Sequence, residues 1–260
     1  MTVDNNKTLQ KISESTAFNK AVAIDNNWIE KLWQWADQFD MLGYATSHDK
    51  EAVLALKRLG AREFDLTGFE KQKCIDTYKT DHIPEELTYL SNLVEISFYG
   101  IDSSHLPQNI SRLANLTKLF IYHYKLTELP SSIGQLSNLT GLFIHKSKLK
   151  GLPDSIGQLC NLNELFISHC ELRDLPDSIG QLTNLTTLFI NHCELKNLPD
   201  SIGQLHNLTE LDLIQCKLTE LPDSIGRLTN LTKLFISDCK IEYLPDSIGQ
   251  LSSLTKLYIN

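Results

Sequence analysis

The sequence has 260 residues, of which 42% are hydrophobic, enough to build a continuous core in one or two domains. Lysine and arginine together number 24 and aspartate and glutamate 32, and the net charge of −8 argues against nucleic-acid binding. Six cysteines without a secretory signal fit a reducing compartment, where they remain thiols.

The first 20 residues contain no apolar run of seven or more, so they resemble neither a Sec signal peptide nor a membrane anchor. No other apolar stretch is long enough to span a bilayer. We therefore expect a cytoplasmic protein with no membrane contact, and a flexible N-terminal segment over residues 1–25. The Ser/Thr/Asn-rich start leaves open export by a non-Sec secretion system.

Two helices are predicted between residues 26 and 60. Asn27 and Glu30 have the spacing of a capping box, and the second helix, Ser47 to Leu59, is stopped by Gly60. Four apolar residues fall on one face of the first helix: Trp28, Leu32, Trp35 and Phe39. We predict that residues 26–60 form a helical N-terminal cap on the open end of the domain that follows.

The segment LPDSIGQL, or a close variant, recurs every 23 residues. Weaker copies begin at Leu106 and Ile83. The clear copies begin at Leu129, Leu152, Leu175, Leu198, Leu221 and Leu244. A period of this length indicates a solenoid of stacked repeats rather than a globular domain.

Each repeat predicts one short strand and one short helical turn. The pattern L-x-x-L-x-L/I gives a strand with alternate side chains inward, and parallel stacking of such strands lines a curved solenoid. Proline followed by Asp-Ser suits entry to a 3₁₀ or helical turn on the convex side. The aspartates of this motif are expected to cap those turns: Asp154, Asp177, Asp200, Asp223 and Asp246.

The repeat domain is predicted to run from residue 61 to residue 260. The segment AREFDL, residues 61–66, reads as a first strand, and residues 61–92 form an irregular first repeat with a loop over Glu70 to Asp81. Regular repeats begin at Leu93. The last repeat, from Leu254, has no polar cap before Asn260, so self-association through this end is one expectation and a fragment another.

The full pattern, L-x-x-L-x-L/I-x-x-C-x-L-x-x-L-P-D-S-I-G-Q-L-x-N, resembles the leucine-rich repeat. Its LPxSIGxL form is similar to repeats of bacterial leucine-rich proteins, of plant intracellular Ras-group relatives and of plant-pathogen effectors that carry a ubiquitin ligase. The resemblance implies an α/β leucine-rich repeat horseshoe whose concave sheet docks proteins. No ligase segment is visible, so only the recognition role is implied.

One concave column of side chains is mainly aromatic. It comprises Ser97, Phe120, Phe143, Phe166, Phe189, Asp212, Phe235 and Tyr258. Four successive phenylalanines would form a stacked ridge that a partner could bind, since soluble monomers usually avoid exposed aromatic strips. Cross-strand stacking or recent repeat duplication explains the same column without any partner.

Aromatic and histidine residues concentrate beside this ridge, with charges of both signs at its edge, a composition typical of protein interfaces. The residues predicted to bind a partner are Phe120, Tyr122, His123, Phe143, His145, Phe166, His169, Phe189, His192, Asp212 and Phe235.

Cysteine occupies the position that leucine-rich repeats usually give to asparagine: Cys170, Cys193, Cys216 and Cys239. A buried thiol replaces asparagine as a small, weak donor. The alternative is metal binding by His169-Cys170 and His192-Cys193, but neighbouring strand residues point to opposite faces, so no metal or other cofactor is expected. The five Asn-Leu-Thr segments are interpreted as turn asparagines that open each strand.

No phosphate loop, nucleophile elbow or His-Glu-x-x-His motif occurs, and the recurring serines and aspartates belong to the repeat. We therefore expect not an enzyme but a scaffold that binds a protein or peptide on the concave aromatic face. The alternatives are a carbohydrate or small-ligand receptor, and the substrate-recognition part of a larger bacterial effector.

Overall fold

The computed structural model describes residues 63–65, 85–89, 91, 93–99, 103–122 and 125–260. Contacts divide the chain into two units, residues 1–61 and 62–260, and every described residue belongs to the second. The predicted helices over residues 27–39 and 47–59 and the predicted loop over residues 70–81 lie outside the described residues. The domain boundaries at residues 25 and 60 therefore stay predictions.

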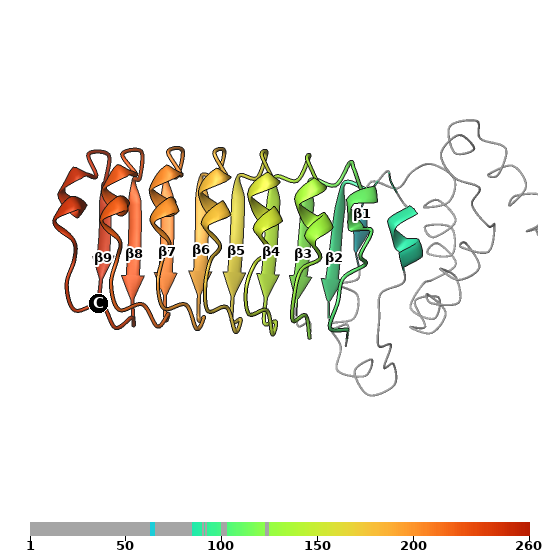
Figure 1. Cartoon of the computed structure of the whole chain (residues 1–260), viewed down its shortest axis with the longest axis horizontal. Helices are drawn as coiled ribbons and strands as arrows, with labels where there is room; N and C mark the ends of the chain where they lie inside the picture. Colours follow the sequence, from blue (N-terminus) through green and yellow to red (C-terminus); the bar gives the residue numbers. More distant parts are fainter. Residues whose placement is uncertain (1–62, 66–84, 90, 92, 100–102, 123–124) are drawn as a thin grey trace, which may run out of the picture. The chain divides into compact units, whose positions relative to one another are not determined.

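The second unit is built on one parallel sheet of nine strands that follow one another in sequence order (Figure 1). The first strand lies inside the predicted segment 61–66. The strands are β1 (Glu63–Asp65), β2 (Glu95–Tyr99), β3 (Lys118–Tyr122), β4 (Gly141–His145), β5 (Glu164–Ser168), β6 (Thr187–Asn191), β7 (Glu210–Ile214), β8 (Lys233–Ser237) and β9 (Lys256–Ile259). The predicted solenoid of stacked repeats is confirmed.

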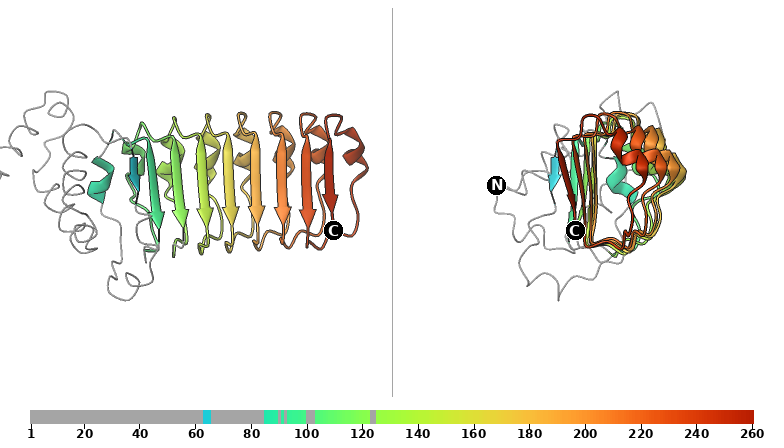
Figure 2. Two further views of the ribbon diagram at one scale, coloured as in Figure 1. Left: turned by 180° about the vertical axis from the view of Figure 1, so that it is seen from behind. Right: turned by 90° about the vertical axis from the view of Figure 1, so that its left-hand side faces the viewer.

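A row of 3₁₀-helices forms a second layer on the opposite side of the solenoid from the sheet (Figure 2). The helices are η2 (Glu85–Tyr89), η3 (Ile110–Arg112), η4 (Ser131–Gln135), η5 (Asp154–Gln158), η6 (Asp177–Gln181), η7 (Asp200–Gln204), η8 (Asp223–Arg227) and η9 (Asp246–Gln250). From η4 onward a proline in extended conformation precedes each helix, such as Pro199 with φ −70° and ψ 153°. Because proline fixes φ near this value, it turns the chain into the helix at the same point in every repeat.

The core lies between the two layers. Leu188 and Ile190 of β6 are fully buried, as are Ile202 and Leu205 on the helix side of the same repeat. Neighbouring repeats place the same residue types in the same positions, so the buried side chains form continuous columns along the solenoid. This burial of leucine and isoleucine is the main source of stability.

Side-chain hydrogen bonds reinforce the contact between repeats. The side-chain amide of Asn207 donates to the carbonyl of Thr183 at 2.8 Å, and the hydroxyl of Thr209 donates to the carbonyl of Thr186 at 3.0 Å. The other Asn-Leu-Thr segments repeat the amide bond, as Asn138 does to Ala114 and Asn230 to His206. The interpretation of these residues as turn asparagines is confirmed.

The prediction that the aspartate row caps the 3₁₀-helices is wrong. The proline is the N-cap residue, the aspartate is the first helical residue, and no side chain makes a capping hydrogen bond in η5 to η9. The first hydrogen bond of the helix is made by the backbone alone, since the N–H of Ile202 donates to the carbonyl of Pro199 at 2.9 Å. The aspartates are therefore left as an exposed charged row.

Neighbouring 3₁₀-helices approach each other closely where glycine meets serine. A β-carbon added at Gly203 would lie 2.5 Å from the carbonyl oxygen of Ser224 and 2.9 Å from its Cβ. A β-carbon added at Gly249, the same position in the last repeat, would meet nothing within 4 Å. Glycine is thus required wherever a further repeat packs against the helix.

We expect Gly203→Ala to lower the free energy of unfolding by about 1–3 kcal/mol, because the added methyl group must push the backbone of Ser224 away. Gly249→Ala serves as the matched control and should leave stability unchanged or raise it by up to about 1 kcal/mol. Urea unfolding followed by circular dichroism measures both. Equal effects of the two substitutions would contradict the proposed close contact.

Candidate functional site

The candidate site is the face of the sheet turned away from the 3₁₀-helices, here called the sheet face, which is the face that the sequence pattern predicts to be concave. In strands β3 to β7 the second and fourth residues are buried in the core. The first, third and fifth residues point outward onto the sheet face, and no other described element covers them. Their identity can therefore vary without disturbing the core.

The phenylalanine column consists of Phe120, Phe143, Phe166 and Phe189, which lie opposite one another in register on β3 to β6. The rings of Phe120 and Phe143 stack with centroids 4.5 Å apart and an interplanar angle of 11°, and those of Phe143 and Phe166 stack at 5.0 Å and 22°. Phe166 and Phe189 meet edge to face at 4.5 Å. Because each ring covers its neighbour, all four side chains are only half-exposed.

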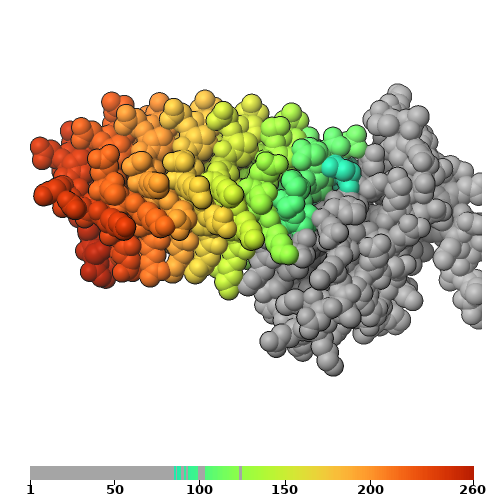
Figure 3. All heavy atoms as spheres, turned by 60° about the horizontal axis from the view of Figure 1, so that its bottom comes forward, coloured from blue at the N-terminus to red at the C-terminus, as the bar shows by residue number. Residues whose placement is uncertain are grey.

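A second aromatic column, of Tyr122, His145, His169 and His192, runs beside the first. His169 and His192 lie just beyond the ends of their strands, and the left-handed backbone at each, with φ 53° and 52°, brings the rings together. The two imidazoles stack at 4.0 Å with an interplanar angle of 13°. Figure 3 turns toward the viewer the edge of the sheet at which the strands end. Equivalent side chains of neighbouring repeats are lined up there in rows.

The surroundings of this second column change two pKa values. Desolvation, followed by the charges of His192 and Lys146, lowers the pKa of His169. Burial, followed by the carboxylate of Glu95, raises the pKa of Tyr122. Both shifts favour the neutral forms at neutral pH. Tyr122 and His169 therefore present uncharged rings to an approaching partner.

Asp212 interrupts the phenylalanine column. It lies in register between Phe189 and Phe235, where the repeat pattern places an aromatic ring. The pairing of β6 with β7 stops at Phe189 and Asp212, whereas the pairs on either side span five residues. Beyond that point the side chain of Asn191 acts as the hydrogen-bond acceptor, because its Oδ1 accepts from the N–H of Ile214 at 3.0 Å.

The carboxyl group of Asp212 is only partly satisfied. Its Oδ1 is buried and has no hydrogen-bond partner among the described residues. Burial, followed by repulsion from Glu210, raises its pKa to about 6, although a hydrogen bond with Asn191 acts in the opposite direction. Sequence reasoning predicted Asp212 as a site residue but missed Asn191, whose only signal was an amide beside the single acidic residue of the column.

Three of the four residues of the cysteine row lie in the core, as predicted, and Cys239 is half-buried. Cys170, Cys193 and Cys216 are buried, and the thiol of Cys216 donates to the carbonyl of Ile190 at 3.1 Å. Burial raises the pKa of Cys216 to about 12. The thiol of Cys216 is therefore protonated at neutral pH, which suits its role as a hydrogen-bond donor to the backbone.

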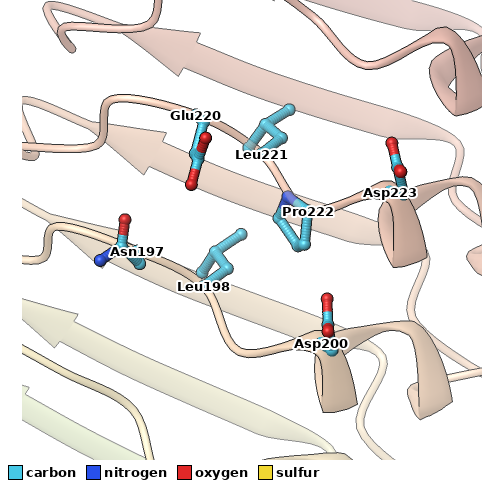
Figure 4. A pocket seen from close by; sticks show the side chains of 7 residues that line it. All are labelled: Asn197, Leu198, Asp200, Glu220, Leu221, Pro222 and Asp223. Carbon is cyan, nitrogen blue, oxygen red and sulfur yellow. The ribbon is translucent and has the colours of Figure 1, made fainter.

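A pocket of about 420 Å³ lies on the other side of the solenoid, between the repeats of η7 and η8 (Figure 4). It is lined by Asn197, Leu198, Asp200, Glu220, Leu221, Pro222 and Asp223. In the part of the chain that the structure describes, no three histidine, cysteine, aspartate or glutamate residues are grouped so that they could hold a metal ion. None of the described helices is long and apolar enough to cross a membrane.

Large apolar side chains are exposed, among the described residues, only from residue 243 onward, at the C-terminal end of the solenoid. They are Tyr243, Leu244, Leu257, Tyr258 and Ile259. Self-association through this end stays a prediction.

The structure brings the predicted partner-binding residues together on one face, apart from His123, which lies outside the described residues. Phe235 belongs to this face too, on β8, but Asp212 separates it from the other phenylalanines. Their role in binding stays a prediction.

A family model described as a leucine-rich repeat region matches three overlapping stretches, residues 65–188, 142–217 and 190–260. None of the curated proteins matches the chain in sequence.

Among solved structures, a leucine-rich repeat protein of Leptospira interrogans is 30% identical, with a TM-score of 0.55 over 76% of this chain. The match spans only 62% of the length of that protein. The leucine-rich repeat domain of the type III effector XopL shares the fold, with 24% identity and a TM-score of 0.62 over 100% of this chain and 96% of that one. The plant peptide hormone receptor RGFR1, solved in complex with RGF2, is 31% identical over 69% of this chain and 34% of its own, with a TM-score of 0.57.

We expect Asp212→Asn to stabilise the protein more at about pH 7.5 than at about pH 4.5. A carboxyl pKa near 6 in the folded state lies above the unfolded value of about 3.9, so the native state binds more protons between these values and its stability falls as pH rises. Asparagine does not titrate, and the gain at the higher pH should be at most about 1 kcal/mol because the group is half-exposed. Urea unfolding at both pH values measures it, and a difference independent of pH would contradict the assigned shift.

Proposed function

The chain belongs to the leucine-rich repeat family, and we propose that it binds an extended peptide segment of a partner protein across its sheet face. Leucine-rich repeat domains are in general protein-interaction modules, and the finer assignment to the sheet face is the proposal. The observation that carries it is the pair of parallel aromatic columns on β3 to β6. Aromatic side chains anchor protein interfaces because they bury a large area at a low cost in conformational entropy.

The shape of the surface supports an extended ligand. The two columns run across successive strands, perpendicular to the chain direction within each repeat, so they form a long strip and not an enclosed cavity. A strip of this kind fits a linear segment that contacts one repeat after another. The similarity to RGFR1, whose structure contains the peptide hormone RGF2, is in line with such a ligand.

The alternative of a carbohydrate receptor is less compatible with the ring geometry. Sugars bind aromatic residues by lying on the ring face. Phe143 has a stacked ring on each face, and Phe120 and Phe166 each have one face on Phe143, at interplanar angles of 11° and 22°. What remains at the surface is their edges, which offer an apolar ridge to the side chains of a peptide.

We expect the triple substitution Phe143→Ala, Phe166→Ala and Phe189→Ala to weaken peptide binding at least about tenfold, because it removes the centre of the ridge. The probe is a set of peptides selected from a random displayed library on the immobilised parent chain. Dissociation constants are then measured by fluorescence anisotropy.

The matched control is Asp154→Ala, Asp177→Ala and Asp200→Ala, which removes three exposed residues from the helix side. Both variants are checked for folding by circular dichroism and thermal melting. Equal binding by the parent and the phenylalanine variant would contradict the proposal, and loss of binding by the control variant would move the site to the helix side.

Acidification should change the affinity if the histidines contact the peptide. The lowered pKa of His169 keeps that side chain neutral at about pH 7.5, so it gains charge only below its usual range. We expect the dissociation constant to change between about pH 7.5 and 5.5, and the change to be smaller in the variant His169→Gln, His192→Gln. This comparison separates the histidines from Asp212, which titrates in the same range. Identical pH profiles for parent and variant would exclude both histidines from the contact.

A further inference from the structure

We propose that the bound peptide places an arginine side chain against Asp212, in the gap that this residue makes in the phenylalanine column. The inference rests on the proposed function and specifies its ligand. A segment with apolar residues over Phe143 and Phe166 would then carry its arginine about two repeats further along the solenoid.

The first observation is the shape of the gap. The register places Asp212 directly between Phe189 on β6 and Phe235 on β8, and its side chain is much smaller than a phenylalanine ring. The ring-to-ring contacts of the column end at Phe189, which meets Phe166 edge to face. A flat group that enters from the sheet face would thus have an aromatic ring on each side and a carboxylate at its base.

The second observation is an unmet hydrogen bond. The Oδ1 atom of Asp212 is buried without a donor among the described residues, and a buried acceptor without a partner destabilises a folded protein. The nearest cation in register, Lys233, is already paired with Glu210 at 2.8 Å. The described residues therefore offer the carboxylate no cation of its own, and a cationic ligand group at the outer side of this half-buried residue would offset its charge.

The third observation is the charge around the gap. Glu210, Asp212 and Asp238 lie on or beside this part of the sheet face, and Lys233 is the one lysine or arginine among the outward residues of β7 and β8. The carboxylate of Asp238 accepts a 3.4 Å hydrogen bond from the side-chain amide of Gln215 and remains exposed. Local negative charge therefore favours a cationic ligand group.

Arginine fits this surrounding better than lysine. A guanidinium group is planar, is more weakly hydrated than an ammonium group, and stacks on aromatic rings, whereas an ammonium group is a compact and strongly hydrated charge. Between Phe189 and Phe235 a planar cation can pair with the carboxylate of Asp212 while its faces contact the rings. Asn191 would hold the carboxylate in place from the other side.

The test uses the peptides selected on the parent chain. We expect the bound peptides to share an arginine at one position. Replacing that arginine by alanine, or Asp212 by asparagine, should each weaken binding about tenfold to a hundredfold. The two changes together should weaken it no more than either one alone, because both remove the same contact. Asp246→Asn, an exposed carboxylate on the helix side, is the matched control and should leave the affinity unchanged.

Four results would overturn the inference. Selected peptides without an arginine, or equal binding by the parent and Asp212→Asn, would exclude the pairing, while continued dependence on the phenylalanines would leave the proposed function standing. Equal affinity after replacement of the peptide arginine by lysine would replace the guanidinium assignment by a general cation site. A selection whose peptides bind independently of Phe143, Phe166 and Phe189 would overturn the proposed function and this inference together.

Discussion

Parallel in-register contact between repeats is the interaction on which the rest of this structure depends. From β3 onward each strand pairs with the strand 23 residues earlier, and the amide of asparagine and the hydroxyl of threonine make the same bond from repeat to repeat. These bonds fix the rotation and the rise of each repeat relative to the last. A leucine at one position therefore always meets a leucine or isoleucine of the next repeat, and the core is continuous.

Because the register is the same from repeat to repeat, a residue type that occurs once per repeat forms a continuous surface across the strands. A phenylalanine that occurs once per repeat becomes a column whose rings cover one another, which reduces the solubility cost of an aromatic strip. A residue that departs from the repeat pattern also has a defined position. Asp212 lies in register between two phenylalanines, and its small side chain leaves a gap in their column. A substitution in a single repeat can therefore change the binding specificity of the sheet face at one defined position.

The two sides of the solenoid tolerate change to different degrees. On the helix side Gly203 leaves no room for a methyl group against Ser224, so variation there disturbs the contact between repeats. On the sheet side the outward residues of each strand contact mainly their equivalents in neighbouring strands. Substitutions on the sheet face therefore cost the least stability, and this is the physical reason for expecting recognition there.

The sequence by itself determined the repeat, the positions of the strands from residue 93 onward, the buried cysteine row and the membership of the phenylalanine column. All of these follow from side-chain periodicity, and a 23-residue period leaves one register in which the repeated leucines form the core. Only the tertiary structure decided the details that depend on backbone conformation and on atoms from different repeats. The leucine pattern does not reveal the left-handed backbone at His169 and His192, the proline that replaces aspartate as the helix cap, or the bond from Ile214 to Asn191. The unsatisfied oxygen of Asp212 arises from the same local contacts, because burial of one atom depends on where three neighbouring strands place their side chains.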